Sequence, residues 1–233
     1  MTGEELRFPE KVFDVRKRLI SVDAPDGSGK SSFVEALADK LRAVTGEKVR
    51  IIQPGKINDS DVDLLASLEQ EQELTRRRNS VWMATMARNY SSVIRPVLDN
   101  GEWVIEDSSE VRALAMSLLV DGGVPGKATE SAFRWLKSGR LTAGLLPNTR
   151  INLVTSPQEC VERVTQREGR PSNLGQMEKL FSAYRDAWEI IRTFQTTTEE
   201  RFIDVRLEKQ IKENLYDYLG GVIKTRVLGL ILR

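Results

Sequence analysis

The chain contains no histidine, and this absence excludes several kinds of active site. Ser-His-Asp triads, Cys-His pairs and zinc or iron sites with histidine ligands all require an imidazole. Any metal must therefore be a hard ion held by oxygen atoms, and Mg²⁺ is the natural candidate.

Cysteine and net charge are also scarce. The single cysteine among 233 residues, Cys160, cannot form an intrachain disulfide, and we expect a protein of the reducing cytoplasm. The 35 basic and 34 acidic residues give a formal net charge of +1. Because there is no excess of Lys and Arg to neutralise a polymer of phosphates, we expect neither a nucleic-acid polymer nor a membrane as a partner.

Long hydrophobic runs are missing from both ends of the chain. Residues 1–17 are too charged for a signal peptide, and we expect them to form an N-terminal extension before the first strand. Residues 221–233 are apolar but are interrupted by Lys224, Thr225 and Arg226. This C-terminal segment predicts a packed terminal helix or an oligomer contact rather than a membrane span.

Short apolar segments are present at five places and predict strands. They cover residues 19–23, 49–53, 102–106, 150–155 and 201–205. Between them, apolar residues recur at helical spacing in 34–41, 73–98 and 177–191. Because strand and helix alternate, the pattern predicts an α/β domain with three layers and a parallel sheet. The stripe expected along 73–98 consists of Trp82, Met86, Tyr90, Val93 and Val97.

The sequence "DAPDGSGKSS", residues 23–32, joins the first predicted strand to the first predicted helix. Gly27 and Gly29 permit unusual dihedral angles, so that several backbone N–H groups can point at one anion. The Lys30 ammonium can reach the β and γ phosphates of a nucleotide, and the Ser31 hydroxyl can bind Mg²⁺. We therefore predict an ATP-binding loop made of Ala24, Pro25, Asp26, Gly27, Ser28, Gly29, Lys30, Ser31 and Ser32.

Ala24 stands where the common phosphate-loop pattern begins with glycine. We expect its methyl group to fit because a residue at negative φ does not need to be glycine. A chance glycine turn is the plain alternative to a nucleotide site. The order of strand, glycine loop and amphipathic helix favours the nucleotide site.

Four further stretches follow the loop in a characteristic order. They are "VRIIQPGK", "SVWMATMARNYSSVIRPVLDNGEWVIEDSS", "LLPNTRINLVTSPQECVERVTQREGR" and "RFIDVRLEKQIKENLYDYL". Together with the loop, they resemble the thymidylate kinase family of P-loop nucleoside monophosphate kinases. The resemblance implies a kinase domain at 18–220, with a five-stranded parallel sheet flanked by helices and a small arginine lid at about 160–172. It also implies transfer of the ATP γ-phosphoryl group to a deoxynucleoside monophosphate, with dTMP as the first acceptor.

The resemblance also assigns catalytic residues on the donor side. Asp107 would organise Mg²⁺ together with Ser31, although a helix N-cap is an alternative role and Glu106 is the neighbouring alternative carboxylate. The catalytic set would be completed by Lys30 and three lid arginines, Arg163, Arg167 and Arg170. The spacing of these arginines places them on one helix face. Spacing alone favours a solvated face, with Arg163 paired to Glu159.

On the acceptor side, the resemblance indicates Asp26, Gln53, Trp82, Arg88 and Ser108. Asp26 resembles the residue that binds the acceptor sugar hydroxyl, with a turn-forming role as the alternative. Trp82 stands where the family stacks an aromatic ring on the acceptor base, with core packing as the alternative. Arg88 lies two positions after Met86, which replaces a family arginine near the base.

Ser108 replaces the arginine with which the family grips the acceptor phosphate. The substitute could be Arg88, Arg112 or one of Arg76, Arg77 and Arg78, and the sequence does not choose among them. Two other hypotheses therefore stay open: a related kinase that uses another deoxynucleotide or a deoxynucleoside, and a catalytically weak nucleotide-binding protein that acts through a partner. The family often forms homodimers through a helical face, which the segment 73–98 would supply by resemblance.

Overall fold

The computed structural model describes residues 18–55, 71–143, 145–169, 173–193, 201–206 and 215–223. For residues 71–78 it describes the backbone but not the side chains. The predicted extension 1–17 lies outside the described residues, as do Arg170 and the part of the C-terminal segment after residue 223.

Five parallel strands form one sheet in the order β2-β3-β1-β4-β5. Their bounds are β1 Leu19–Asp23, β2 Val49–Ile52, β3 Trp103–Asp107, β4 Thr149–Val154 and β5 Arg201–Arg206. Each lies within one residue of the predicted segment at either end. The prediction of a five-stranded parallel sheet is therefore confirmed, and the carboxyl ends of all five strands meet at one edge.

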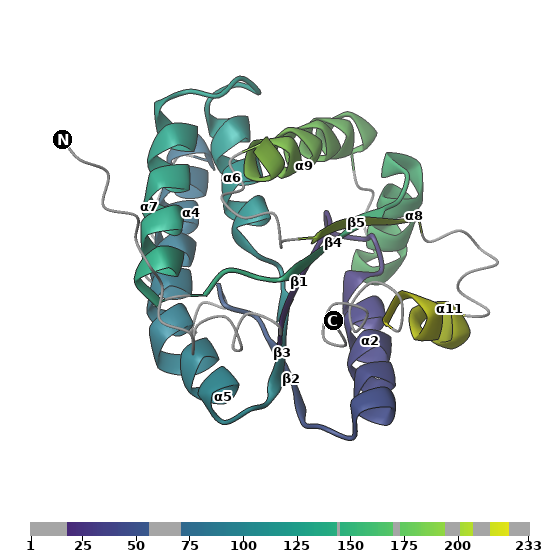
Figure 1. The fold of residues 1–233 in the computed structure, drawn as a ribbon. Helices are drawn as coiled ribbons and strands as arrows, with labels where there is room; N and C mark the ends of the chain where they lie inside the picture. The colour runs from purple at the N-terminus through teal and green to yellow at the C-terminus, as the bar shows by residue number, and fades with distance from the viewer. Residues whose placement is uncertain are drawn as a thin grey trace.

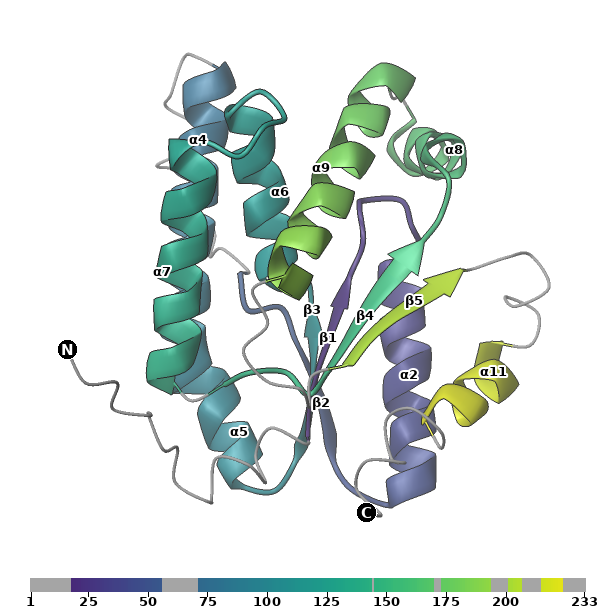
Figure 2. The same cartoon turned by 45° about the horizontal axis from the view of Figure 1, so that its top comes forward.

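Helices cover both faces of the sheet and give the predicted three layers (Figure 1). One face carries α2 Lys30–Thr45 and α11 Leu215–Val222, which pack together. The other face carries α4 Glu71–Asn89, α6 Glu110–Val120, α7 Lys127–Ala143 and α9 Leu174–Thr193. The turned view shows α8, Pro157–Glu168, at the carboxyl end of β4 and away from α5, Arg95–Asp99 (Figure 2).

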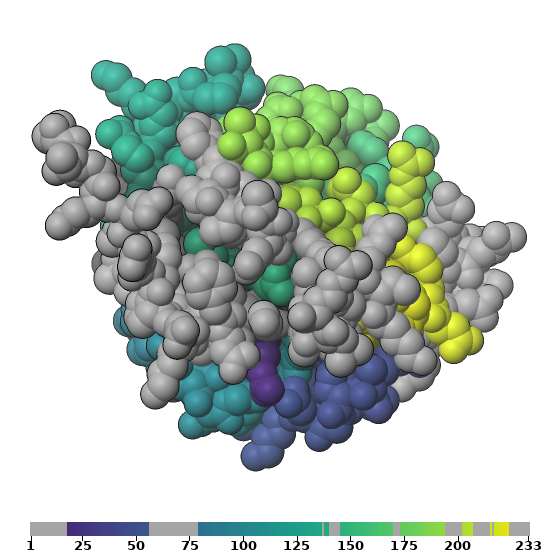
Figure 3. Space-filling model, viewed as in Figure 1, coloured from purple at the N-terminus to yellow at the C-terminus, as the bar shows by residue number. Residues whose placement is uncertain are grey.

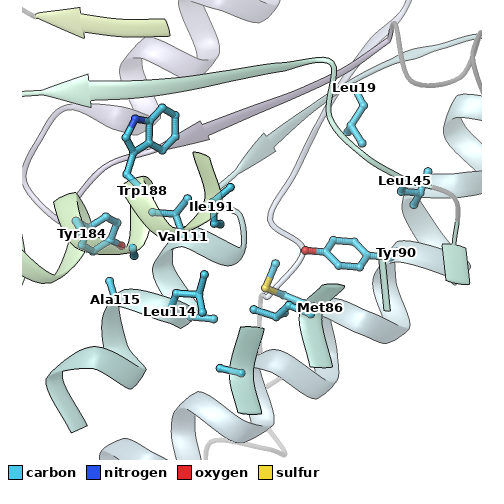
Figure 4. Packing of buried hydrophobic residues seen from close by; sticks show 14 of the residues in the cluster. Leu19, Met86, Tyr90, Val111, Leu114, Ala115, Leu145, Tyr184, Trp188 and Ile191 are labelled. Carbon is cyan, nitrogen blue, oxygen red and sulfur yellow. The ribbon is translucent and has the colours of Figure 1, made fainter. Parts of the chain in front are cut away.

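Each face of the sheet has its own hydrophobic core, because side chains alternate along a strand. Leu19 of β1 and Val104 of β3 point to the α4/α6/α9 side, whereas Ile20 and Ile105 point to the α2 side. On the first side, Tyr184, Trp188 and Ile191 of α9 lie against α6, as Figure 4 shows. The predicted apolar stripe of 177–191 is confirmed by this packing.

The predicted long helix over 73–98 is interrupted by a π-helical turn, Tyr90–Ile94. The buried hydrophobic residues in this stretch are Met86, Tyr90, Ile94 and Leu98, which recur at every fourth position. An α-helix with 3.6 residues per turn would rotate such a series off the core, and the wider π turn brings it back. Val93 is consequently 40% exposed, so the prediction that it belongs to the buried stripe is wrong.

In the space-filling view, side chains fill the spaces between the ribbons (Figure 3). The side chains of α9 lie next to those around the connection between α6 and α7. Within the described part of the chain, none of the helices combines the length and apolar character needed to cross a membrane.

The core between α6 and α9 yields a stability prediction. Leu114 is fully buried on α6, so we expect Leu114→Ala to lower the free energy of unfolding by about 2–5 kcal/mol through lost contacts and a residual cavity. Val124 is 68% exposed, and Val124→Ala serves as the matched apolar truncation with little expected effect. Urea unfolding followed by circular dichroism measures both, and equal losses would contradict the assigned core.

Candidate functional site

The connection between β1 and α2 has the backbone geometry of an anion-binding loop. Gly27 and Gly29 have φ angles of 82° and 87°, which an L side chain rarely adopts. Helix α2 then begins at Lys30 without a side-chain cap and without an acidic residue in its first turn. Its first N–H groups and its dipole therefore favour a bound anion. Ala24 is buried and has no positive φ, which confirms that its methyl group fits.

The loop also packs against helix α8. A Cβ atom on Gly27 would lie 2.7 Å from the carbonyl oxygen of Cys160, so residue 27 must be glycine for this close approach as well. From the same helix, Arg163 donates from Nη1 to the Gly27 carbonyl oxygen over 3.1 Å. Helix α8 and the loop between β1 and α2 are thus held together by packing and by a hydrogen bond.

Lys30 and Asp107 form a largely buried ion pair at the mouth of the loop, with 12% and 4% of their side chains exposed. They meet because β1 and β3 are neighbouring parallel strands, with Val22 opposite Asp107. Gln53, just after β2, donates from Nε2 to the second carboxylate oxygen of Asp107 over 2.8 Å. Burial lowers the pKa of Lys30 to about 8; the charge of Asp23 opposes this shift, and the positive charge of Arg112 adds to it.

The alternative role for Asp107 was a helix N-cap, and the structure gives that role to another residue. Ser109 caps α6, with its side chain accepting from the N–H of Val111 over 3.4 Å. Glu106 is buried within the sheet and, by strand alternation, points to the face opposite Asp107. Of the two carboxylates, Asp107 is therefore the one that faces Lys30.

Asp23 anchors the segment that follows β3. Its carboxylate accepts from the Ser109 backbone N–H over 2.7 Å and from the Ser109 hydroxyl over 2.6 Å. Burial raises the pKa of Asp23, and these two hydrogen bonds oppose that rise. Between these anchors, Ser108 has a φ of 77°, a strained backbone for a residue with a side chain. Position 108, where the resemblance leads us to expect an arginine, is thus buried and held in place by its neighbours.

Oxygen atoms suited to Mg²⁺ lie beside the loop. Ser31 is exposed at the start of α2, next to Lys30, and the Asp107 carboxylate is the nearby anionic oxygen donor. Mg²⁺ usually binds only a few protein oxygen atoms and completes its coordination with water and substrate phosphates. One hydroxyl and one carboxylate from the protein fit this preference. The described residues hold no cluster of three or more His, Cys, Asp or Glu side chains that could bind a metal without such help.

Arg163 and Arg167 both lie on α8, but their side chains have different contacts. Arg163 contacts the loop carbonyl and lies 3.7 Å from Glu159, the predicted i,i+4 partner. Arg167 is 64% exposed one turn later and contacts Glu168 over 3.1 Å. Helix α8 ends at Glu168, and Gly169 after it has a φ of 67°. Arg170 lies outside the described residues, so the expectation that it shares one helix face with Arg163 and Arg167 stays a prediction.

Two acceptor-side candidates, Trp82 and Asp26, lie beside the carboxyl ends of the strands. The Trp82 indole lies directly against Gly55, because a Cβ atom there would be 1.9 Å from the ring. Trp82 is half-buried against the core, so the packing role is present and part of the ring stays accessible. Asn89 fixes this turn by donating to the Pro54 carbonyl oxygen over 2.8 Å. Asp26 is exposed in the loop, 3.4 Å from Nη1 of Arg112.

Arg88 is the candidate that the structure does not bring to this group. It is exposed on α4, two residues after buried Met86 and hence on the other side of the helix. Sequence analysis weighed Arg112 but did not place it, and it missed Asn89 and the hydrogen bonds that join Asp23 to Ser109. For Arg112, the usable signal is its position shortly after the end of the third predicted strand, close to Ser108.

Comparison with known proteins finds similarity to curated bacterial thymidylate kinases. The chain is 29% identical to the thymidylate kinase of Rhizorhabdus wittichii over 72% of its own length and 78% of the relative's. It is 26% identical to that of Exiguobacterium sp., over 88% of its own length and 98% of the relative's. No protein-family profile matches the chain. The sheet order, the loop geometry and these similarities together support a thymidylate kinase-like family for the chain and, through that relationship, indicate a nucleoside monophosphate kinase.

Proposed function

We propose that the protein transfers the γ-phosphoryl group of ATP to the phosphate of a deoxynucleoside monophosphate, with dTMP as the first acceptor to test. The observation that carries this proposal is the meeting of Lys30 and Asp107 at the mouth of the loop, with Arg163 bound to the loop itself. The similarity to thymidylate kinases supports the choice of dTMP.

The residues of the site have the separate roles that phosphoryl transfer requires. This reaction depends on positioning and on neutralising charge more than on covalent chemistry, so the lack of histidine is no obstacle. The loop N–H groups and Lys30 hold the donor phosphates, and Arg163 and Arg167 stabilise charge on the transferring group. Ser31 and Asp107 would hold Mg²⁺, which supplies further charge neutralisation when it is bound. We also propose that the protein is a cytoplasmic homodimer whose interface is formed by the segment 73–98.

A second candidate is a related kinase with a different acceptor, either another deoxynucleotide or a deoxynucleoside. Ser108 favours it, because the residue after Asp107 carries no charge for an acceptor phosphate. Gln53 and the small Ser109 also stand where the family has other residues, so the acceptor pocket is the less preserved half of the site.

Lys30 gives the most direct test of the loop. We expect Lys30→Ala to lower kcat by about 100-fold or more, because the variant loses the cation that contacts the transferring phosphoryl group. A coupled ADP-release assay measures this change. Lys48 is exposed at the amino end of β2, at the opposite edge of the sheet, and Lys48→Ala is the control. Near-full activity of Lys30→Ala would remove the loop from the mechanism.

The acceptor is tested with a panel of nucleoside monophosphates and nucleosides in the same ADP-release assay. We expect dTMP to give the highest kcat/KM. Turnover confined to another deoxynucleotide or to a nucleoside would instead support the second candidate. Binding of ATP without transfer to any member of the panel would indicate a nucleotide-binding protein that acts through a partner.

The two lid arginines should differ in their kinetic effects. Arg167→Ala should lower kcat by about 100-fold while changing the Kd for ATP by about twofold at most, because Arg167 makes no contact with the resting loop. Arg163→Ala should also weaken ATP binding, because it removes the hydrogen bond to Gly27. The exposed Arg192 on α9 provides the control variant Arg192→Ala. Single-turnover kinetics and ATP titration separate the two effects, and an unchanged rate for Arg167→Ala would exclude it from the lid.

A further inference from the structure

The residue that follows Asp107 at the end of β3 carries no positive charge. Ser108 follows Asp107 there, and its short side chain is buried and held at a φ of 77°. A phosphate group brought next to Lys30 needs charged N–H donors on its other side, because charge-assisted hydrogen bonds are the strong ones for phosphate. The chain must supply such donors from somewhere other than position 108.

The Arg112 guanidinium extends from α6 towards the phosphate loop. Arg112 lies in the first turn of α6, where its backbone N–H donates to the Ser109 carbonyl oxygen over 3.2 Å. Its Nη1 atom is 3.4 Å from Oδ1 of Asp26, a long hydrogen bond that uses one of five guanidinium donors. About a third of the side chain, 33%, is exposed. Arg112 is therefore positioned at the loop with donors still available to a ligand.

Lys30 and Arg112 reach the loop from two elements, α2 and α6. Lys30 begins α2 and pairs with Asp107 at the end of β3, whereas Arg112 contacts Asp26 of the loop from α6. Each cation has more N–H donors than the one that contacts its carboxylate, so a phosphate group in the space beside the loop can accept from both. A phosphate group fits this space because the planar guanidinium presents two parallel donors to it.

The other described arginines near the carboxyl edge of the sheet have different positions or partners. Arg150 is buried and pairs with Glu110 over 2.8 Å. Arg163 binds the loop carbonyl from the α8 side, and Arg88 faces away from buried Met86 on α4. The side chains of residues 76–78 are outside the described set. Of these arginines, Arg112 is the one that contacts the loop from α6, the helix that follows Ser108.

We propose that Arg112 binds the phosphate group of the acceptor nucleoside monophosphate and so makes the site select monophosphates over nucleosides. This inference rests on the proposed function. The cation that the resemblance leads us to expect directly after the strand is here supplied from the first turn of α6. Because Arg112 also contacts Asp26, the same side chain links the acceptor phosphate to the loop that holds the donor.

Binding measurements without phosphoryl transfer test this role. Isothermal titration is carried out with dTMP, thymidine and ATP separately, on the wild type and on Arg112→Ala. We expect Arg112→Ala to raise the Kd for dTMP by about 10- to 100-fold, the loss typical of a charged hydrogen-bonding partner, while the Kd values for thymidine and ATP change little. Arg112→Lys should recover part of the dTMP affinity, because it restores the charge without the planar fork.

Two further variants separate a binding role from a structural one. Arg95 is 31% exposed and pairs with Asp99 on α5, away from the site, so Arg95→Ala is the control of matched exposure and should bind dTMP normally. Adding Ser108→Arg to Arg112→Ala should restore the preference for dTMP over thymidine. A general loss of folding would weaken ATP binding and lower Tm together with dTMP binding, and that result would contradict the proposal.

The outcomes also separate this inference from the proposed function. If Arg112→Ala keeps the wild-type preference for dTMP, the role of Arg112 is wrong while the kinase proposal stands. If the wild type binds ATP but binds dTMP no better than thymidine, a dTMP kinase and a phosphate-binding Arg112 are both excluded.

Discussion

The ion pair between Lys30 and Asp107 is the interaction on which the geometry of the site depends. It joins the start of α2 to the end of β3 across the neighbouring strand β1, so it exists only because these strands are parallel and in register. Both side chains are largely buried, and removing either one would leave the other charge without its partner in a poorly solvated place. A nucleotide phosphate offers Lys30 a second anionic partner at this point, while Asp107 stays available to a metal ion.

Close packing and backbone strain hold the surrounding groups in position. Gly27 lets the loop lie directly against α8, because a Cβ atom there would meet the Cys160 carbonyl oxygen. Ser108 keeps a left-handed backbone because Asp23 binds Ser109 through two hydrogen bonds. Such strain is typical of functional sites, where surrounding contacts determine a conformation that the residue would not adopt alone. The site therefore consists of rigid elements that place a few charged groups around one anion position.

Sequence patterns predicted the fold well where the signal is local. The five strands are short apolar runs bounded by polar residues, and their parallel arrangement follows from the helices between them. The stripe along 73–98 was wrong at Val93, because a pattern with helical period cannot reveal that a π turn shifts the phase by one residue. Arg88 illustrates a similar limit, since a helix that is correctly predicted can still turn a particular side chain away from the site.

Local sequence patterns are enough to predict a phosphate-binding loop and to limit the kinds of chemistry available to the protein. Glycine spacing, a following lysine and serine, and the absence of histidine are local or compositional facts that need no coordinates. Tertiary structure alone decided that Asp107 faces Lys30 rather than capping a helix, and that Arg163 and Arg112 approach the loop from opposite sides. These contacts join residues separated by 77, 136 and 86 positions, and such distant residues meet only when the sheet and its helices have packed.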